Sequence, residues 1–120
     1  MASSKDVVLA YHKAADNKDF AGARQLLHDN LEFSGPFDTF HAADDYMHAI
    51  QKLSMIVERV DIKKVFEDGS DVAMFCDLVT KVAGTSFVAE WYQVKNGKIA
   101  NIKVLFDARP FAAMFAQKAG

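Results

Sequence analysis

The sequence predicts an α+β domain in which three N-terminal helices cover the concave face of a curved antiparallel sheet. Two observations lead to this prediction. The first half of the chain holds three segments with helical periodicity, and the second half holds four strand-like runs joined by short turns. Helices followed by strands are typical of α+β domains. We expect the sheet to bend into a cone with a pocket inside, and a short C-terminal helix to close the fold.

The first helix is expected over about residues 4–17, because Ser3 and Asp6 form a capping-box-like start ahead of an apolar face. Asp19 can cap a second helix, which we expect to end near residues 29–30. The apolar faces are Val7, Val8, Tyr11, Ala14 and Ala15 in the first helix, and Phe20, Ala23, Leu26 and Leu27 in the second.

A short strand is expected at residues 31–33, where the run Ser34-Gly35-Pro36 then interrupts it. A third helix follows from about residue 42 to residue 53. Its apolar stripe consists of Tyr46, Met47, Ile50 and Leu53.

From about residue 56 the periodicity changes to that of strands. Four strands are expected near residues 56–67, 71–82, 85–95 and 98–106. The junction Asn96-Gly97 is the strongest hairpin signal among the turns. Pro110 suits the first turn of the closing helix. The apolar side of that helix would be Phe111, Met114 and Phe115.

Length and composition indicate one domain, residues 1–120, that is large enough to bury its own core. The formal net charge of −2 argues against a nucleic-acid partner. Cys76 is the only cysteine, which excludes an internal disulfide and a thiolate metal site. The first six residues lack the apolar core of a signal peptide, and no apolar run has membrane-spanning length. We therefore expect a soluble cytoplasmic protein that binds neither membrane nor nucleic acid.

Hairpin geometry predicts which strand side chains face inward. A two-residue turn at Asn96-Gly97 pairs Lys95 with Lys98, and this register places Trp91 opposite Ile102. The apolar face, expected under the helices and around the cavity, is Val72, Met74, Cys76, Leu78, Phe87, Ala89, Trp91, Ile102, Val104 and Phe106. The other face is Phe75, Asp77, Val79, Val88, Glu90, Tyr92, Asn101, Lys103 and Leu105. It mixes charges with aromatic residues and suits a homodimer contact, although a bulge would exchange the faces beyond it.

Asp77 and Glu90 fall beside each other in this register, and two interpretations of them are open. Adjacent carboxylates push one pKa upward, so the two side chains could share a proton. Lys103 lies on the same predicted face and offers a simple ion pair instead. We favour the ion pair.

One set of residues runs through the whole chain. It comprises Tyr11, the helix break Asn17-Lys18-Asp19-Phe20, the run Leu26-Leu27-His28-Asp29-Asn30 before Phe33, the run from Glu90 to Ile99, and the closing Phe106-Asp107. This set resembles the SnoaL-like family of the nuclear transport factor 2-like superfamily. The resemblance implies the cone fold. It implies no single reaction, because the superfamily includes isomerases, hydrolases, cyclases, dehydratases and non-catalytic proteins.

Two enzyme groups of the superfamily can be compared residue by residue. Ketosteroid isomerases use a tyrosine of the first helix, which Tyr11 matches, and a carboxylate base after the first strand. That base position falls on Gly35, and Asp38 lies three residues later. Limonene epoxide hydrolases end their last strand in an aspartate after an aromatic residue, as Asp107 does here, but they also need an Arg-x-Asp. The comparable place reads Phe75-Cys76-Asp77, without the arginine.

The resemblance makes Asp107 and Tyr11 the candidate catalytic residues, and SnoaL-type cyclases rely mainly on such a late acid. Asp107 would need apolar surroundings to raise its pKa, which neighbouring phenylalanines could provide. Alternatively, it caps the closing helix or pairs with Arg109. Tyr11 would donate a hydrogen bond into the cavity, or it is a core tyrosine with one hydrogen bond.

Candidate ligand-binding residues are the apolar side chains expected around the cavity, although core packing explains many of them equally well. They are Phe33, Phe37, Phe40, Met47, Met55, Met74, Trp91 and Phe106. A polar group on the third helix, His41, Asp44, Asp45 and His48, has metal-ligand residue types. It lies opposite the apolar stripe and is expected to face water. We expect no metal and no cofactor.

These observations lead to a functional expectation in three forms. The first is cofactor-independent acid–base catalysis, of the isomerase, cyclase or hydrolase class, on a small hydrophobic substrate. The second is a binding protein for a hydrophobic metabolite, without turnover. The third is an accessory protein, a homodimer through the outer sheet face, whose surface matters more than its cavity.

Overall fold

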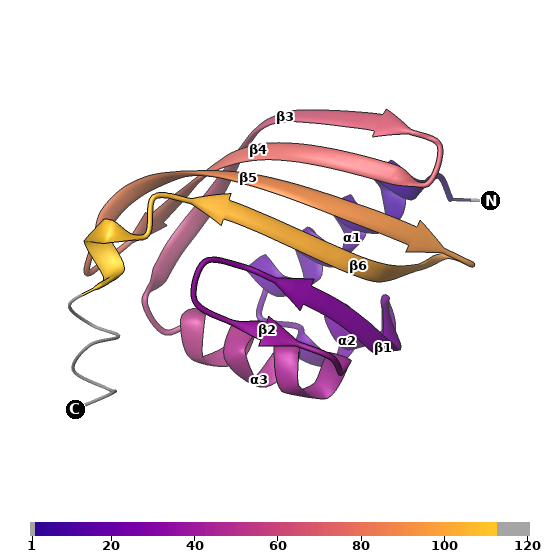
Figure 1. Cartoon of the computed structure of the whole chain (residues 1–120), viewed down its shortest axis with the longest axis horizontal. Coiled ribbons are helices and arrows are strands. Elements are labelled where there is room, and N and C mark those ends of the chain that lie inside the picture. Colours follow the sequence, from indigo (N-terminus) through magenta and orange to yellow (C-terminus); the bar gives the residue numbers. More distant parts are fainter. Residues whose placement is uncertain (1, 113–120) are drawn as a thin grey trace.

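The computed structural model describes residues 2–112 and shows helices packed on one side of a six-stranded sheet (Figure 1). The elements are α1 (Ser4–Asp16), α2 (Phe20–Gln25), β1 (Leu27–Ser34), β2 (Thr39–Phe40), α3 (Ala43–Leu53), β3 (Val57–Asp68), β4 (Asp71–Thr80), β5 (Gly84–Lys95) and β6 (Lys98–Phe106). A helical turn at residues 109–112 follows, as predicted from Pro110, while Met114 and Phe115 lie outside the described residues. The predicted α+β fold is confirmed.

Local capping explains where the first two helices begin. Ser3 and Asp6 form the capping box of α1, in which each side chain accepts a hydrogen bond from the other residue's backbone N–H. Asp19 accepts from the backbone N–H of Gly22 and starts α2 at the predicted position. Both predictions from the sequence are confirmed.

Within residues 2–112, no helix is both long and apolar enough to cross a membrane.

The end of α2 corrects a prediction. The sequence indicated a helix that continues to residues 29–30, but α2 stops at Gln25 and β1 begins at Leu27. Leu27 and Leu31 are fully buried, and the backbone N–H of Ile99 donates to the carbonyl of Leu26 at 2.8 Å. Tertiary pairing with the last strand therefore overrides the local helical pattern.

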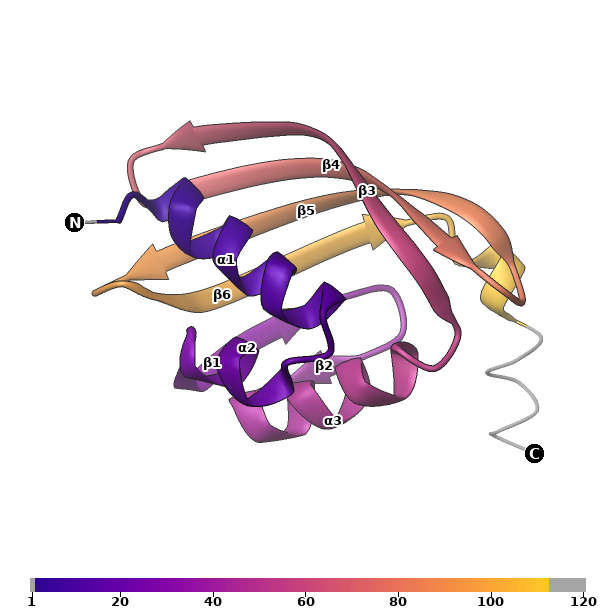
Figure 2. The ribbon, with the colours of Figure 1, turned by 180° about the vertical axis from the view of Figure 1, so that it is seen from behind.

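The sheet has the strand order β2-β1-β6-β5-β4-β3. β1 runs parallel to β6, whereas the other neighbouring strands are antiparallel, so the sheet is mixed rather than purely antiparallel. Register shifts occur within β3 and between β5 and β6, as expected of a strongly bent sheet. Figure 2 shows α1 lying across the concave face of β3–β6, with α3 beside β1 and β2.

The second correction concerns which side chains of β5 face inward. The Asn96-Gly97 turn pairs Lys95 with Lys98 as predicted, but a bulge at residues 93–94 places Trp91 opposite Lys103. At the other end of β5, three residues separate Thr80 from its partner Gly84. Val88, Glu90 and Tyr92 consequently face inward, while Phe87, Ala89 and Trp91 face outward, opposite to the prediction. The predicted neighbours Asp77 and Glu90 lie on opposite faces.

The core lies between α1 and the concave side of the sheet. It contains little besides aliphatic and aromatic side chains, so hydrophobic burial holds the helices on the sheet. Its largest fully buried members are Tyr92, Leu27, Leu31, Met74, Ile99, Ile102, Val8 and Val72. Cys76 is also buried, as predicted from its apolar strand.

Candidate functional site

A group of ionisable side chains lies in this otherwise apolar interior. We call it the inner polar cluster: His12 and Tyr11 from α1, Tyr46 from α3, and Glu90 and Tyr92 from β5. The Tyr92 hydroxyl donates to Glu90 Oε1 at 2.9 Å. The Nε2 atom of His12 lies 2.7 Å from the Tyr92 oxygen and 3.2 Å from Glu90 Oε1. Two side chains, one from α1 and one from β5, therefore converge on one carboxylate oxygen.

The number of available protons determines which group donates in each of these hydrogen bonds. Because the Tyr92 proton goes to Glu90, the Tyr92 oxygen can only accept from His12, so Nε2 carries a hydrogen. The second carboxylate oxygen of Glu90, Oε2, makes no hydrogen bond to any residue within 2–112. Glu90 is therefore held through one oxygen and has the other one available.

The hydroxyls of Tyr11 and Tyr46 form a second pair, 2.6 Å apart. Two phenols share one hydrogen bond here, so one of their two protons remains to be donated elsewhere. Burial raises the pKa of Tyr11 and of Tyr46, and the nearby Glu90 charge adds to both increases. Both phenols are therefore hydrogen-bond donors throughout the neutral range.

Ring contacts join the two parts of the inner polar cluster. The Tyr11 ring lies edge-on to His12 at 5.5 Å between centroids and 6.4 Å from the ring of Tyr92. His12 and Tyr92 also meet edge-to-face, at 5.8 Å. Such arrangements are favourable for aromatic pairs and fix the orientation of each ring.

The cross-strand neighbours of Glu90 are apolar. Met74 lies opposite it on β4 and Val104 opposite it on β6. The side chains of Glu90 and His12 keep only 15% and 11% of their surface exposed. A carboxylate in such surroundings is costly unless it is hydrogen-bonded, which Tyr92 and His12 accomplish. The residual exposure means that water can reach the pair.

The sequence places these side chains together by simple periodicities. Tyr11 and His12 follow Val7 and Val8 by about one helical turn, so they share the buried side of α1. Residues 90 and 92 point to the same side of β5 because side chains alternate along a strand. Sequence reasoning missed His12 and assigned Glu90 to the outer face. The polar His12 directly beside Tyr11, on the apolar stripe, was the available signal.

Asp107, the predicted catalytic acid, has different surroundings. Arg109 donates to it from the guanidinium, with Nη2 2.7 Å from Oδ2, and from the backbone N–H. These hydrogen bonds lower the pKa of Asp107 to about 2, whereas a general acid needs a raised pKa. Its contacts are those of the alternative interpretation, a pair with Arg109. No contact joins Asp107 to Tyr11 within residues 2–112, and its catalytic role stays a prediction.

The predicted ligand-binding residues fall into separate groups. Met47 and Met74 lie in the core, and Phe33 and Phe40 pack around the ring of Tyr46. Two of the others, Phe37 and Phe106, contact each other at 6.1 Å between ring centroids. Met55 is 72% exposed in the turn before β3, and Trp91 lies on the outer face.

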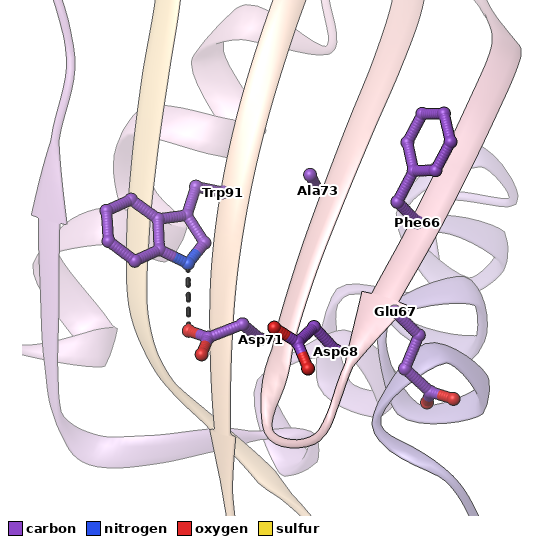
Figure 3. A pocket seen from close by; sticks show the side chains of 6 residues that line it. All are labelled: Phe66, Glu67, Asp68, Asp71, Ala73 and Trp91. Carbon is purple, nitrogen blue, oxygen red and sulfur yellow. Dashed lines mark hydrogen bonds between the residues drawn. The ribbon is translucent and has the colours of Figure 1, made fainter.

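Two open hollows lined by described residues lie away from the inner polar cluster. One, of about 440 Å³, is on the outer face of β3–β5 (Figure 3). It is lined by Phe66, Glu67, Asp68, Asp71, Ala73 and Trp91. The other, of about 340 Å³, borders the Asn96-Gly97 turn. Its lining residues are His28, Asp29, Asn30, Lys95, Asn96 and Ala100.

Four polar residues on α3 and just before it have the side-chain types of metal ligands. His41, Asp44, Asp45 and His48 are all exposed, as expected for a solvated face. His41 pairs with Glu32 at 2.6 Å, and Arg24 holds Asp44 at 2.8 Å. The part of the chain that the structure describes holds no group of three or more His, Cys, Asp or Glu side chains placed to bind a metal ion.

A bent sheet with helices across its concave face, and polar side chains gathered beneath the first helix, defines the nuclear transport factor 2-like class of fold. Within it, the SnoaL-like domain family matches residues 8–102 of this chain. The chain belongs to the SnoaL-like family. No curated protein matches the chain.

Solved structures agree with this assignment. An NTF2-like protein from Cytophaga hutchinsonii has 26% identity and a TM-score of 0.84, over 93% of this chain and 96% of that one. A protein from Kribbella flavida has 26% identity and a TM-score of 0.85, over 96% of both chains. An LEH-like epoxide hydrolase from Mycobacterium tuberculosis has 20% identity and a TM-score of 0.76, over 95% of this chain and 96% of that one, which shows a shared fold.

Proposed function

We propose that the protein binds a small hydrophobic molecule at the concave face, and that Glu90, held in place by Tyr92 and His12, takes a proton from it and returns one. The observation that carries the proposal is the asymmetry of Glu90. Its Oε1 atom accepts from Tyr92 at 2.9 Å, while Oε2 makes no hydrogen bond within residues 2–112. A carboxylate fixed through one oxygen and open at the other has the geometry of a general base.

The histidine holds the carboxylate that acts as the base. His12 Nε2 lies 3.2 Å from the Glu90 carboxylate and 2.7 Å from the Tyr92 oxygen. Because Nε2 already carries a hydrogen, it stabilises the Glu90 carboxylate as a donor, and the proton taken up at Glu90 returns to the substrate from the same Oε2 atom.

The phenol pair fits the other half of an acid–base reaction. Proton removal leaves negative charge on the substrate, and a buried hydroxyl is an effective donor to such charge because it cannot be displaced by water. The Tyr11–Tyr46 pair retains one donatable proton and is near enough to Glu90 to feel its charge. The reaction class is isomerisation, cyclisation or hydrolysis of a largely apolar substrate, since Met74 and Val104 flank Glu90.

A binding protein without turnover is the second candidate, and one observation favours it. No buried side-chain nitrogen or oxygen among the described residues lacks a hydrogen-bond partner. Every fully buried polar atom of the inner polar cluster thus has a partner without a substrate, as in a core that is merely well packed. The dimeric accessory protein remains the third form of the expectation.

The test begins with native mass spectrometry of the purified protein, which identifies any small molecule that co-purifies. That compound, together with a panel of cyclic enones and terpenoid epoxides, is incubated with the protein in D₂O. NMR then follows C–H exchange and product formation. Glu90→Gln should lower the rate by about 100-fold or more, because general acid–base catalysis contributes that much, with affinity nearly unchanged.

The matched control is Glu32→Gln, since Glu32 also pairs with a histidine, His41, but on the exposed surface. It should leave both rate and affinity unchanged. Asp107→Asn tests the rival acid: loss of the rate in this variant, with Glu90→Gln fully active, would transfer the role to Asp107. Binding without any exchange or product would support the binding protein, and failure to bind any compound would contradict the small-molecule proposal.

A further inference from the structure

The negative charge of Glu90 has no lysine or arginine beside it. Every lysine within residues 2–112 is exposed to solvent. Of the arginines in that range, Arg59 and Arg109 are exposed, and Arg24 is engaged in two ion pairs at the surface. A carboxylate in apolar surroundings is costly without a counter-charge, even when it accepts hydrogen bonds. The site around Glu90 therefore favours the addition of a positive charge.

A second carboxylate, that of Asp16, lies near the same histidine. Asp16 follows His12 by four residues, so both side chains lie on the same side of α1. Burial raises the pKa of Asp16, and the charge of His12 acts against the increase. One protonated His12 balances one of the two carboxylates. The site keeps a net negative charge in either protonation state of the imidazole.

The atoms around Glu90 suit an organic ammonium group. Because Oε2 makes no hydrogen bond to any residue within 2–112, it can accept a charge-assisted hydrogen bond from an N–H group. The rings of Tyr11, His12 and Tyr92 lie together, with every pair of centroids within 6.4 Å. Aromatic rings attract cations, and a group of rings is the usual means by which proteins recognise ammonium ligands.

The next row of inward-facing side chains is apolar and partly open. Beyond Glu90 the register places Cys76, Val88 and Phe106 beside one another on β4, β5 and β6. Ile62 lies opposite Cys76 at the β3 end of this row and is 39% exposed. Figure 2 shows that α1 does not cover the first half of β3, which follows α3. A ligand with a charged end and an apolar body can therefore place its charge at Glu90 and its body along this row.

We infer that the substrate is a small hydrophobic amine, bound as its ammonium ion with an N–H group on Glu90 Oε2. The inference rests on the proposed function, because it assigns a ligand to the same carboxylate. Transfer of one proton to Oε2 breaks the N–H bond, forms an O–H bond and leaves the electron pair on nitrogen. That pair can attack a carbonyl or epoxide carbon of the same molecule. Oε2 then returns the proton to the oxygen atom that takes the displaced electron pair.

A series of ligands that share one ring and differ in charge tests the inference. Cyclohexylamine, cyclohexanol and cyclohexanecarboxylate are titrated at neutral pH into ¹⁵N-labelled protein, and the amide chemical shifts report both affinity and location. The amine should bind at least about 10-fold more tightly than the alcohol, the difference expected of one hydrogen bond between charged groups, and the carboxylate should bind most weakly. The amides that shift should lie around His12, Glu90 and Tyr92.

Glu90→Gln should abolish the preference for the amine. Glutamine keeps the size of the side chain and an oxygen that accepts from Tyr92, so the amine affinity should fall about 10-fold or more while the alcohol affinity stays the same. The matched control is Asp68→Asn, because Asp68 lines the outer hollow beside Trp91, where an ammonium group would also find a carboxylate and a ring. It should leave the amine affinity unchanged.

Equal affinities of the wild-type protein for cyclohexylamine and cyclohexanol overturn the inference, and this comparison decides even if Glu90→Gln does not fold. An amine affinity that is lost in Asp68→Asn and kept in Glu90→Gln overturns it as well. Both results leave the proposed function standing if neutral enones or epoxides show exchange or product formation. Failure of the proposed function gives a different result, which is the absence of exchange and product with every compound, whatever its charge.

Discussion

The hydroxyl oxygens of Tyr11 and Tyr46 lie 2.6 Å apart and tie the middle of α1 to the start of α3. Together with Tyr92 they are the three tyrosines of the chain, and all three are buried. Burial raises the pKa of each of them. Every tyrosine therefore reports on the same interior, which makes the inner polar cluster observable by absorption.

We predict that the folded protein forms no tyrosinate near pH 10, where an ordinary tyrosine titrates. A phenol whose pKa is raised by folding favours the folded state while it is protonated. That contribution is complete below about pH 10 and is lost as the pH rises toward the raised values. Ultraviolet titration should show all three phenols ionising together as the protein unfolds in alkali. In urea-unfolded protein the three phenols should titrate near pH 10. A tyrosine that ionises near pH 10 while the protein is still folded would contradict the prediction.

The hydrogen bond between Tyr11 and Tyr46 should be measurable as a coupling energy. Tyr11→Phe or Tyr46→Phe alone leaves a buried hydroxyl without its partner, which should cost about 1–3 kcal/mol of unfolding free energy. The double variant should cost less than the sum of the two, because no orphaned hydroxyl remains. Urea unfolding of the four proteins measures the cycle. Strictly additive losses would show that the two hydroxyls do not interact.

The Cys76 thiol should be inert in the folded protein. Burial raises its pKa to about 12, and the charge of Glu90 contributes to the increase. At pH 8 the thiolate fraction is then about 10⁻⁴, against roughly a quarter for an unfolded cysteine. Alkylation by iodoacetamide should therefore be slower by about a thousandfold in the native state. Because Cys76 is the only cysteine, one mass measurement over time reports the rate, with urea-unfolded protein as the control.

The features that could be predicted from the sequence are those whose interacting residues lie close together along the chain. The capping box of Ser3 and Asp6 was readable because both partners lie within one helical turn. The Asn96-Gly97 turn was readable for the same reason, and both residues have positive φ, 52° and 77°. The parallel pairing of β1 with β6 joins segments about 70 residues apart, and no local pattern indicates it.

The candidate site was harder to predict, because one bulge decides which side chains enter it. The register shift at residues 93–94 moves the partner of Trp91 from Ile102 to Lys103 and turns Glu90 inward. A bulge adds a single residue to one strand and leaves little trace in the sequence. The Thr80 hydroxyl, which accepts from the N–H of Ala83 and donates to the carbonyl of Gly84, fixes the other end of β5. Tyr11 was identified through the family resemblance, and the clear apolar stripe of its helix indicated that the side chain points inward.

The C-terminal end of α1 allows a prediction about stability. The backbone N–H of Lys18 donates to the carbonyl of Ala15, and that of Asp19 donates to Ala14, which is the Schellman pattern of a helix end. Lys18 occupies the left-handed position of this motif with φ 59°, where glycine has no steric cost. Lys18→Gly should therefore raise the unfolding free energy by about 0.5–1 kcal/mol, less whatever glycine adds to the entropy of the unfolded chain.

Thermal and urea unfolding measure the change in unfolding free energy. The matched control is Lys13→Gly, which removes the same positive charge. Lys13 is exposed like Lys18 but lies within α1, where a glycine weakens the helix. That variant should lose about 1 kcal/mol. Opposite signs for the two substitutions would show that backbone conformation, not charge, sets the effect at the helix end. Equal losses in both variants would mean that the positive φ of Lys18 carries no strain that glycine relieves.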